Sequence, residues 1–137
     1  MRDVTEALAA VPMFSACTKK ELKEIAKLGE RVRVSEGTAL TNEGRIGHEF
    51  YVLLDGKAEV LRGGQQVSVL GQGQWFGELA LLDPAPRSAT VRMASDGEVL
   101  EITQPSFYQL LEDIPLLSRR LLAGMARRLH EIDGIKA

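Results

Sequence analysis

The fold class follows from one stretch of sequence, FYVLLDGKAEVLR, at residues 50–62. An apolar run of aromatic and branched residues ends at Asp55-Gly56, a dipeptide that supplies the positive φ angles of a two-residue turn. The segment from Lys57 to Arg62 then continues in an alternating apolar and polar pattern. This arrangement predicts a β-hairpin.

Two further turn signals lie C-terminal to this stretch. Gly63-Gly64 predicts a second hairpin, and Ser95-Asp96-Gly97 separates Thr90–Met93 from Glu98–Ile102 to predict a third. Three hairpin signals within about fifty residues favour a closed antiparallel roll or sandwich over a parallel sheet.

The flanking segments have helical patterns. Thr18 and Glu21 have the spacing of a capping box, so we expect the first thirty residues to be helical. After Pro105 the apolar spacing returns to that of a helix, and Pro115 opens a longer segment that reaches about Asp133.

The chain of 137 residues is about the length of one domain. We therefore expect a single α+β domain over 1–137, with N-terminal helices at 1–29, a β-roll at 30–104 and two C-terminal helices at 105–134.

Composition excludes several classes of protein. A net charge of −2 argues against a nucleic-acid partner, and no apolar run approaches the length of a membrane span. Cys17 is the only cysteine, which excludes an internal disulfide and suits a cytoplasmic location. Two histidines without CxxC or HExxH predict no metal site, and we find no catalytic constellation.

A second stretch, FGELALLDPAPRSATV at 76–91, carries the candidate chemistry. Gly77 precedes a helical run, and a helix start exposes unpaired N–H groups that favour an anion. Arg87 suits bidentate binding of a phosphate, and Ser88 adds a hydroxyl donor. Glu78 is an acceptor for a sugar hydroxyl or a support for Arg87. The alternative is a structural ion pair between Glu78 and Arg87 that closes a surface loop.

The same stretch resembles the phosphate-binding cassette of the cyclic nucleotide-binding domain family, which includes cAMP receptor protein and the protein kinase A regulatory subunits. The resemblance extends to EGTALTNEG, to FYVLLDGKAEVL as the family's central hairpin and to LLAGMARRL, and it covers about residues 10–133. It implies a jelly-roll-like, double-stranded β-helix in a stand-alone domain of the bacterial type.

The resemblance also implies a role for each residue of the site. Glu78 would bind the ribose 2′-hydroxyl, and Arg87 would neutralise the cyclic phosphate. The remaining ligand-binding candidates are the backbone from Gly77 through Leu79 to Ala80, then Ser88 and Ala89, and the pocket-lining candidates Val69, Leu70 and Leu79, which are equally explained as core.

The chain departs from the family pattern in places. Arg45 and His48 stand where acidic residues are common, and Ile132-Asp133 stands where bacterial transcription factors place a Thr-Ser pair against adenine. A base contact would then be apolar capping by Ile132 or stacking by a nearby side chain. Ser88, where a threonine often accompanies cGMP preference, favours cAMP over cGMP.

The last helix carries two further patterns. The pairs Arg119-Arg120 and Arg127-Arg128 predict a solvated basic face or a contact with an acidic partner. An apolar stripe with 3-4-3 spacing fits packing onto the roll or a homodimer seam; its members are Leu122, Met125, Leu129 and Ile132.

We therefore expect a cytoplasmic, non-enzymatic receptor for a 3′,5′-cyclic nucleotide, most simply cAMP, without a further cofactor. Its C-terminal helices would shift on binding and act on a protein effector, with no nucleic acid bound by this chain. The alternatives are a ligand-independent interaction module and an N-terminal sensor fragment of a transcription regulator; we favour a stand-alone sensor.

Overall fold

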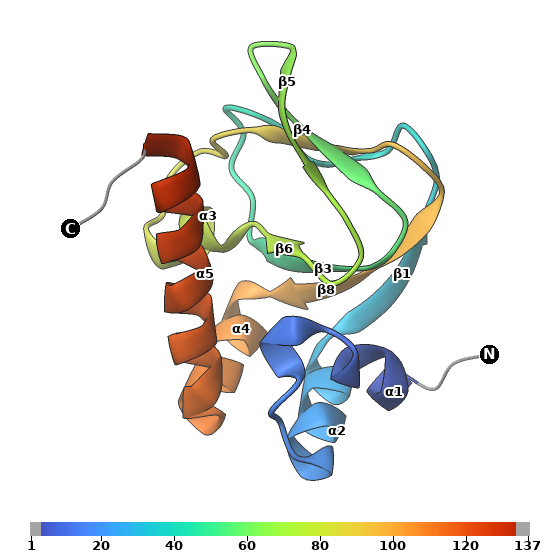
Figure 1. Ribbon diagram of the computed structural model, residues 1–137, viewed down its shortest axis with the longest axis vertical. Helices are drawn as coiled ribbons and strands as arrows, with labels where there is room; N and C mark the ends of the chain where they lie inside the picture. The colour runs from blue at the N-terminus through green and yellow to red at the C-terminus, as the bar shows by residue number, and fades with distance from the viewer. Residues whose placement is uncertain (1–3, 134–137) are drawn as a thin grey trace.

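The computed structural model describes residues 4–133, and side chains up to residue 131 (Figure 1). Its elements in chain order are α1 (Val4–Ala9), η1 (Pro12–Phe14), α2 (Lys19–Leu28), β1 (Glu30–Val34), β2 (Ala39–Thr41), β3 (Glu49–Asp55), β4 (Ala58–Arg62), β5 (Gln65–Leu70), β6 (Trp75–Phe76), α3 (Glu78–Leu82), β7 (Thr90–Met93), β8 (Gly97–Thr103), α4 (Gln104–Asp113) and α5 (Pro115–Asp133).

The strands form two antiparallel sheets of four strands each. The first sheet has the order β1-β8-β3-β6, and the second has the order β2-β7-β4-β5. Figure 1 shows the β4–β5 hairpin projecting at the end of the roll away from α1 and α2, while α5 runs along one side. The predicted α+β class with an antiparallel roll is confirmed.

Two of the three predicted hairpins are wrong. The turn at Asp55-Gly56 joins β3 of the first sheet to β4 of the second, and the turn before Gly97 joins β7 to β8 across the sheets in the same way. A Cβ at Gly56 would lie 2.8 Å from the carbonyl oxygen of Asp96, so the two crossover turns pack against each other. The chain reverses at these turns, but its strands pair elsewhere.

The third hairpin is confirmed. β4 and β5 pair on either side of Gly63 and Gly64, whose φ angles are 57° and 79°. The predicted capping box is also present, because Thr18 Oγ1 accepts from the Glu21 N–H while Glu21 accepts from the Thr18 N–H.

Alternate residues of β3 contribute to two separate cores. Phe50, Val52 and Leu54 face the helices, whereas Tyr51 and Leu53 face the space between the sheets. A strand that is buried on both faces reads as a continuous apolar run. This double burial explains why FYVLL at 50–54 lacks alternation.

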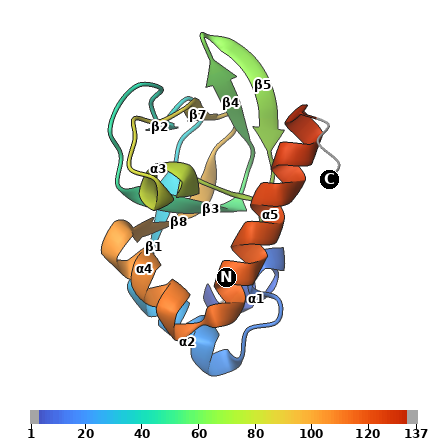
Figure 2. The same ribbon diagram turned by 90° about the vertical axis from the view of Figure 1, so that its left-hand side faces the viewer.

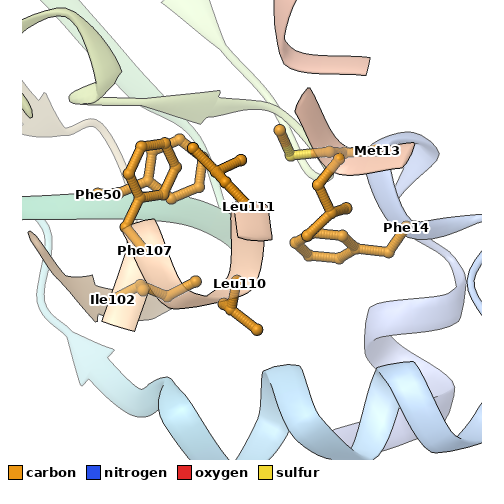
Figure 3. Close-up of a pocket in the computed structure, with 8 residues that line it drawn as sticks. Met13, Phe14, Phe50, Ile102, Phe107, Leu110 and Leu111 are labelled. Atoms are coloured by element: carbon orange, nitrogen blue, oxygen red, sulfur yellow. The ribbon is translucent and has the colours of Figure 1, made fainter. Parts of the chain in front are cut away.

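A small apolar hollow lies within the core between the first sheet and the helices (Figure 3). Its volume of about 10 Å³ is at the lower limit for one water molecule and far below that of a nucleotide. The lining residues are Met13, Phe14, Phe50, Ile102, Phe107, Leu110, Leu111 and Leu117. The hollow is therefore a packing defect that α4 and η1 share.

α5 buries only part of its apolar stripe. Leu122 is 62% exposed and Leu129 is 49% exposed, so these two leucines do not pack onto the roll. Among the α5 residues whose burial is described, the buried ones are Leu117, Leu121 and Gly124. None of the helices within residues 4–133 has the length and hydropathy that a membrane span requires.

Candidate ligand-binding site

The candidate site begins at the turn between β6 and α3. Gly77 is the N-cap of α3 and has a φ of 96°, a conformation that L side chains rarely adopt. A Cβ at this position would also lie 2.8 Å from the carbonyl oxygen of Glu49. Glycine is therefore required here both for the turn and for the close approach of β3.

Arg87, which follows Gly77 by 10 residues, contacts this turn with its side chain. Its side chain is only 7% exposed, with Nη1 donating to the Gly77 carbonyl at 2.9 Å and Nη2 donating to the Glu49 carbonyl at 2.8 Å. A Cβ at Gly47 would lie 2.6 Å from Nη2 and 2.7 Å from Cζ of Arg87. Gly47 thus leaves the space in which the guanidinium sits.

The backbone around Arg87 is fixed by the loop after β2. The Arg87 N–H donates to the Arg45 carbonyl at 2.8 Å, and the Gly44 N–H donates to the Arg87 carbonyl at 2.8 Å. Arg45 therefore contributes to the site through its backbone carbonyl.

Glu78 is the second buried charged residue of the site and is 3% exposed. Its Oε1 accepts from Nη1 of Arg128 at 3.2 Å, while Oε2 has no hydrogen-bond partner within the part of the chain that the structure describes. Burial raises the pKa of Glu78, and the charge of Arg128, a backbone hydrogen bond and the charge of Arg87 oppose that rise. A buried acceptor without a partner costs about 1–3 kcal/mol, which a hydroxyl donor would offset.

The predicted alternative of an ion pair between Glu78 and Arg87 is wrong. Arg87 is held by two carbonyl groups, and the salt-bridge partner of Glu78 is Arg128. Both side chains are buried, so they do not close a surface loop. The guanidinium of Arg87 and the carboxylate of Glu78 can therefore each bind a different group of a ligand in one site.

Arg128 reaches this site from α5 and was missed by the sequence analysis, which placed it on a solvated face or against an acidic partner. Its Nη2 donates to the Trp75 carbonyl, and its guanidinium lies 4.1 Å from the centroid of the Trp75 ring. Nothing local in the sequence marks this contact, because Glu78 and Arg128 are 50 residues apart.

The other predicted site residues differ in their burial. Ser88 and Leu79 are exposed, whereas Ala80 and Ala89 are half-buried. Val69 is 51% exposed, and Leu70 is buried in the core between the sheets. The side chain of Ile132 lies outside the described residues. The roles of these residues in ligand contact remain predictions.

The fold and this site define a class of ligand-binding β-roll domains, in which a buried arginine and a buried carboxylate meet at a glycine turn. Residues 31–113 match the family "cyclic nucleotide-binding domain". The chain belongs to the cyclic nucleotide-binding domain family.

The relatives of this chain include fungal and bacterial proteins. A cAMP-dependent protein kinase regulatory subunit of Hypocrea atroviridis is 36% identical over 127 residues, which covers 92% of this chain and 28% of that protein. The cyclic AMP receptor protein of Thermus thermophilus is 32% identical over 127 residues, which covers 89% of this chain and 59% of that protein. The chain thus spans less than two thirds of either relative.

A solved structure supports the same assignment. The crystal structure of Thermus thermophilus catabolite activator protein superposes with a TM-score of 0.81 at 31% identity and covers 89% of this chain and 60% of that one. The fold of this solved structure therefore agrees with the family assignment.

Proposed function

We propose that this domain is a non-catalytic receptor for a 3′,5′-cyclic nucleotide, and that the nucleotide is cAMP. The observation that carries the proposal is the buried carboxylate of Glu78, which follows the glycine turn that accepts from Arg87. Its Oε2 has no hydrogen-bond partner among the side chains and backbone described for residues 4–133. A ligand with a hydroxyl donor beside an anion satisfies both groups. The names of the relatives, which refer to cAMP, support the same ligand.

Each group has a chemical task in this proposal. Glu78 Oε2 accepts the ribose 2′-hydroxyl, and Arg87 donates charged hydrogen bonds to the cyclic phosphate. Ser88 is exposed and can add its hydroxyl, and the backbone from Gly77 to Ala80 contributes N–H groups. In this family a threonine at the position of Ser88 often accompanies cGMP preference, so the serine supports cAMP over cGMP.

Three contacts connect the site and α3 to the C-terminal helices. Arg128 of α5 holds Oε1 of Glu78, and Tyr108 of α4 donates its hydroxyl to the Leu81 carbonyl at the end of α3. Gln104 donates to the same carbonyl at 3.4 Å. A ribose hydroxyl bound to Glu78 would share the carboxylate with Arg128. If the ligand binds more tightly when α5 is in one of two positions, ligand binding shifts the population of α5 towards that position.

A single cysteine suits a reducing compartment, and we place the domain in the cytoplasm.

The shifted helices provide a surface for a protein effector. The exposed leucines of α5, Leu122 and Leu129, are available to an effector or to a second copy of the chain.

Isothermal titration calorimetry with cAMP and cGMP tests the proposal. We expect both ligands to release heat, with the tighter binding for cAMP, and Arg87→Ala to weaken binding by roughly 2–4 kcal/mol because it removes a charged donor from a buried site. Arg92→Ala is the matched control, since Arg92 is exposed and pairs with Glu59 on the outer surface. Titrations without heat at millimolar ligand would contradict the proposal and favour a ligand-independent interaction module.

A further inference from the structure

A second carboxylate, that of Glu49, lies close to the guanidinium of Arg87. The backbone carbonyl of Glu49 accepts from Nη2 of Arg87 at 2.8 Å, and the side-chain Oε2 of Glu49 lies 4.0 Å from the same nitrogen. The His48 N–H donates to Oε2 at 2.8 Å and fixes the carboxylate in place. The side chain of Glu49 is 34% exposed, so water screens this charge only in part.

Further acidic groups lie near Glu49 on the first sheet. Glu101 pairs across the first sheet with Tyr51 on β3 and with Glu30 on β1. Burial and the charges of Glu49 and Glu30 raise the pKa of Glu101. Burial, with the charges of Glu101 and Glu49, raises the pKa of Tyr51 to about 12, while the charge of Arg87 opposes that rise.

Two carboxylates therefore lie near the positive charge of Arg87. Oε2 of Glu49 lies 4.0 Å from Nη2, and Glu78 lies close enough that the charge of Arg87 opposes the rise in its pKa. A phosphate with one negative charge is neutralised by Arg87, whereas a second negative charge meets Glu49 and Glu78. The site should then bind a singly charged phosphate group more tightly than a doubly charged one.

We infer that Glu49 is a specificity-determining residue that favours a singly charged phosphodiester over a doubly charged phosphate monoester. The inference rests on the proposed function, since it concerns the phosphate group of the same ligand. A cyclic phosphate is a diester with one charge, while a nucleoside 5′-monophosphate carries about −1.5 to −2 at pH 7. Glu49 thus helps the site to reject the hydrolysis product of a cyclic nucleotide.

Coulomb's law gives a quantitative form to the inference. A phosphate oxygen bonded to Nη2 of Arg87 would lie about 2.9 Å from that nitrogen, and hence no more than about 7 Å from Oε2 of Glu49. The repulsion is proportional to the charge of the ligand. Removing the charge of Glu49 should therefore raise affinity roughly two- to threefold for a monoanion and by about the square of that factor for a dianion.

The experiment compares three ligands in three proteins. The ligands are cAMP, adenosine 5′-monophosphate and adenosine 5′-monophosphate methyl ester, which is open like the monophosphate but carries one charge. The proteins are the wild type, Glu49→Gln and Glu98→Gln. The glutamine keeps an acceptor for the His48 N–H, and the backbone carbonyl that holds Arg87 is unchanged.

Glu98→Gln is a matched control for the change in charge. Glu98 lies on β8 opposite Asp55, at the other end of the sheet from Glu49, which lies opposite Thr103. Five residues of strand separate the two ends by about 16 Å, which is beyond the screening length of roughly 10 Å at 0.1 M salt. We expect this variant to bind all three ligands as the wild type does.

We expect Glu49→Gln to gain most affinity for the monophosphate and to gain similar, smaller factors for cAMP and the methyl ester. A structural role for Glu49 would instead lower all three affinities together. The inference is overturned if the ratio of cAMP to monophosphate affinity is unchanged, or if 20 mM monophosphate still fails to compete with cAMP on the variant. Absence of cAMP binding to the wild type would instead refute the proposed function.

Discussion

Gly47 illustrates how a residue without a side chain can govern a binding site. A Cβ at this position would overlap the guanidinium of Arg87, which is buried and bonded to two carbonyl groups. We expect Gly47→Ala to displace the guanidinium and to weaken cAMP binding by about tenfold or more, because a misplaced bidentate donor loses much of its charged hydrogen bonding. Calorimetric titration measures this loss.

Gly71→Ala is the control for the glycine substitution. The nearest atom to a Cβ at Gly71 is Oε1 of Gln74 at 3.9 Å, which is an ordinary contact distance. This control should bind cAMP normally. Equal affinities of Gly47→Ala and the wild type would show that Arg87 can bind phosphate from another position.

Glu78 should make stability depend on pH. Because burial raises its pKa above the ordinary value of 4.5, the folded protein holds the proton more tightly than the unfolded chain does. The free energy of unfolding should then decrease as the pH rises from 4.5 through the raised pKa, and Glu78→Gln should remove this part of the slope.

Urea denaturation of both proteins between about pH 4.5 and 7.5 measures the difference. The other carboxylates are common to the two proteins, so the difference in unfolding free energy isolates Glu78. Parallel pH profiles would show that ionisation of Glu78 does not cost stability in the folded protein.

At the scale of elements, the position of α5 depends on a close contact between Gly124 and Trp75. A Cβ at Gly124 would overlap the Trp75 ring, with Cη2 at 3.1 Å. Replacing glycine by alanine inside a helix normally stabilises by up to about 1 kcal/mol, but overpacking typically costs about 1–3 kcal/mol. We therefore expect Gly124→Ala to lower the melting temperature.

Ala123→Gly calibrates the helix propensity at the exposed neighbouring position. If α5 had room to move, Gly124→Ala would raise the melting temperature by about as much as Ala123→Gly lowers it. That outcome would contradict close packing of α5 against Trp75.

The elements also show what sequence patterns can predict. Helix limits and turn positions follow from local chemistry, as at Thr18 and at Gly63-Gly64, because capping and positive φ angles involve neighbours in the chain. Strand pairing does not follow in this way. Gly56 marks a reversal of the chain correctly, yet the partners of β3 and β4 are set by burial of both faces of β3 and by packing between two distant turns.

In the site, too, local features could be predicted from the sequence and long-range contacts could not. Gly77, Glu78 and Arg87 lie in one segment whose residue types indicate anion and hydroxyl recognition, and the structure brings them together. Arg128 and Glu49 could not be assigned from local spacing, because their contacts cross the molecule from α5 and β3. Charged residues on amphipathic elements most often face solvent, so the pattern of α5 favoured the wrong environment for Arg128.

At the scale of the whole molecule, Arg128 should transmit ligand binding from the roll to α5. Figure 2 shows α5 crossing the molecule from the level of α2 and α4 towards β5, so a movement at Arg128 affects a long surface. We expect cAMP to change amide hydrogen exchange along α5 in the wild type. In Arg128→Gln these changes should be reduced several-fold while cAMP still binds, because the charged link to Glu78 is lost.

Arg127→Gln is the neighbouring control, since Arg127 is exposed. It should retain the exchange response of the wild type. If Arg128→Gln also retains the full response, the coupling passes through another route, such as the Tyr108 contact with α3.

The packing of α5 against Trp75 has a consequence for the fluorescence of the protein. Trp75 is the single tryptophan of the chain, it is 8% exposed, and it lies beneath both Gly124 and the guanidinium of Arg128. Any displacement of α5 changes the polarity and the charge around this one indole. The intrinsic emission of the unlabelled protein therefore reports where α5 lies, so the switch can be followed in solution by the wavelength and quenching of a single native fluorophore.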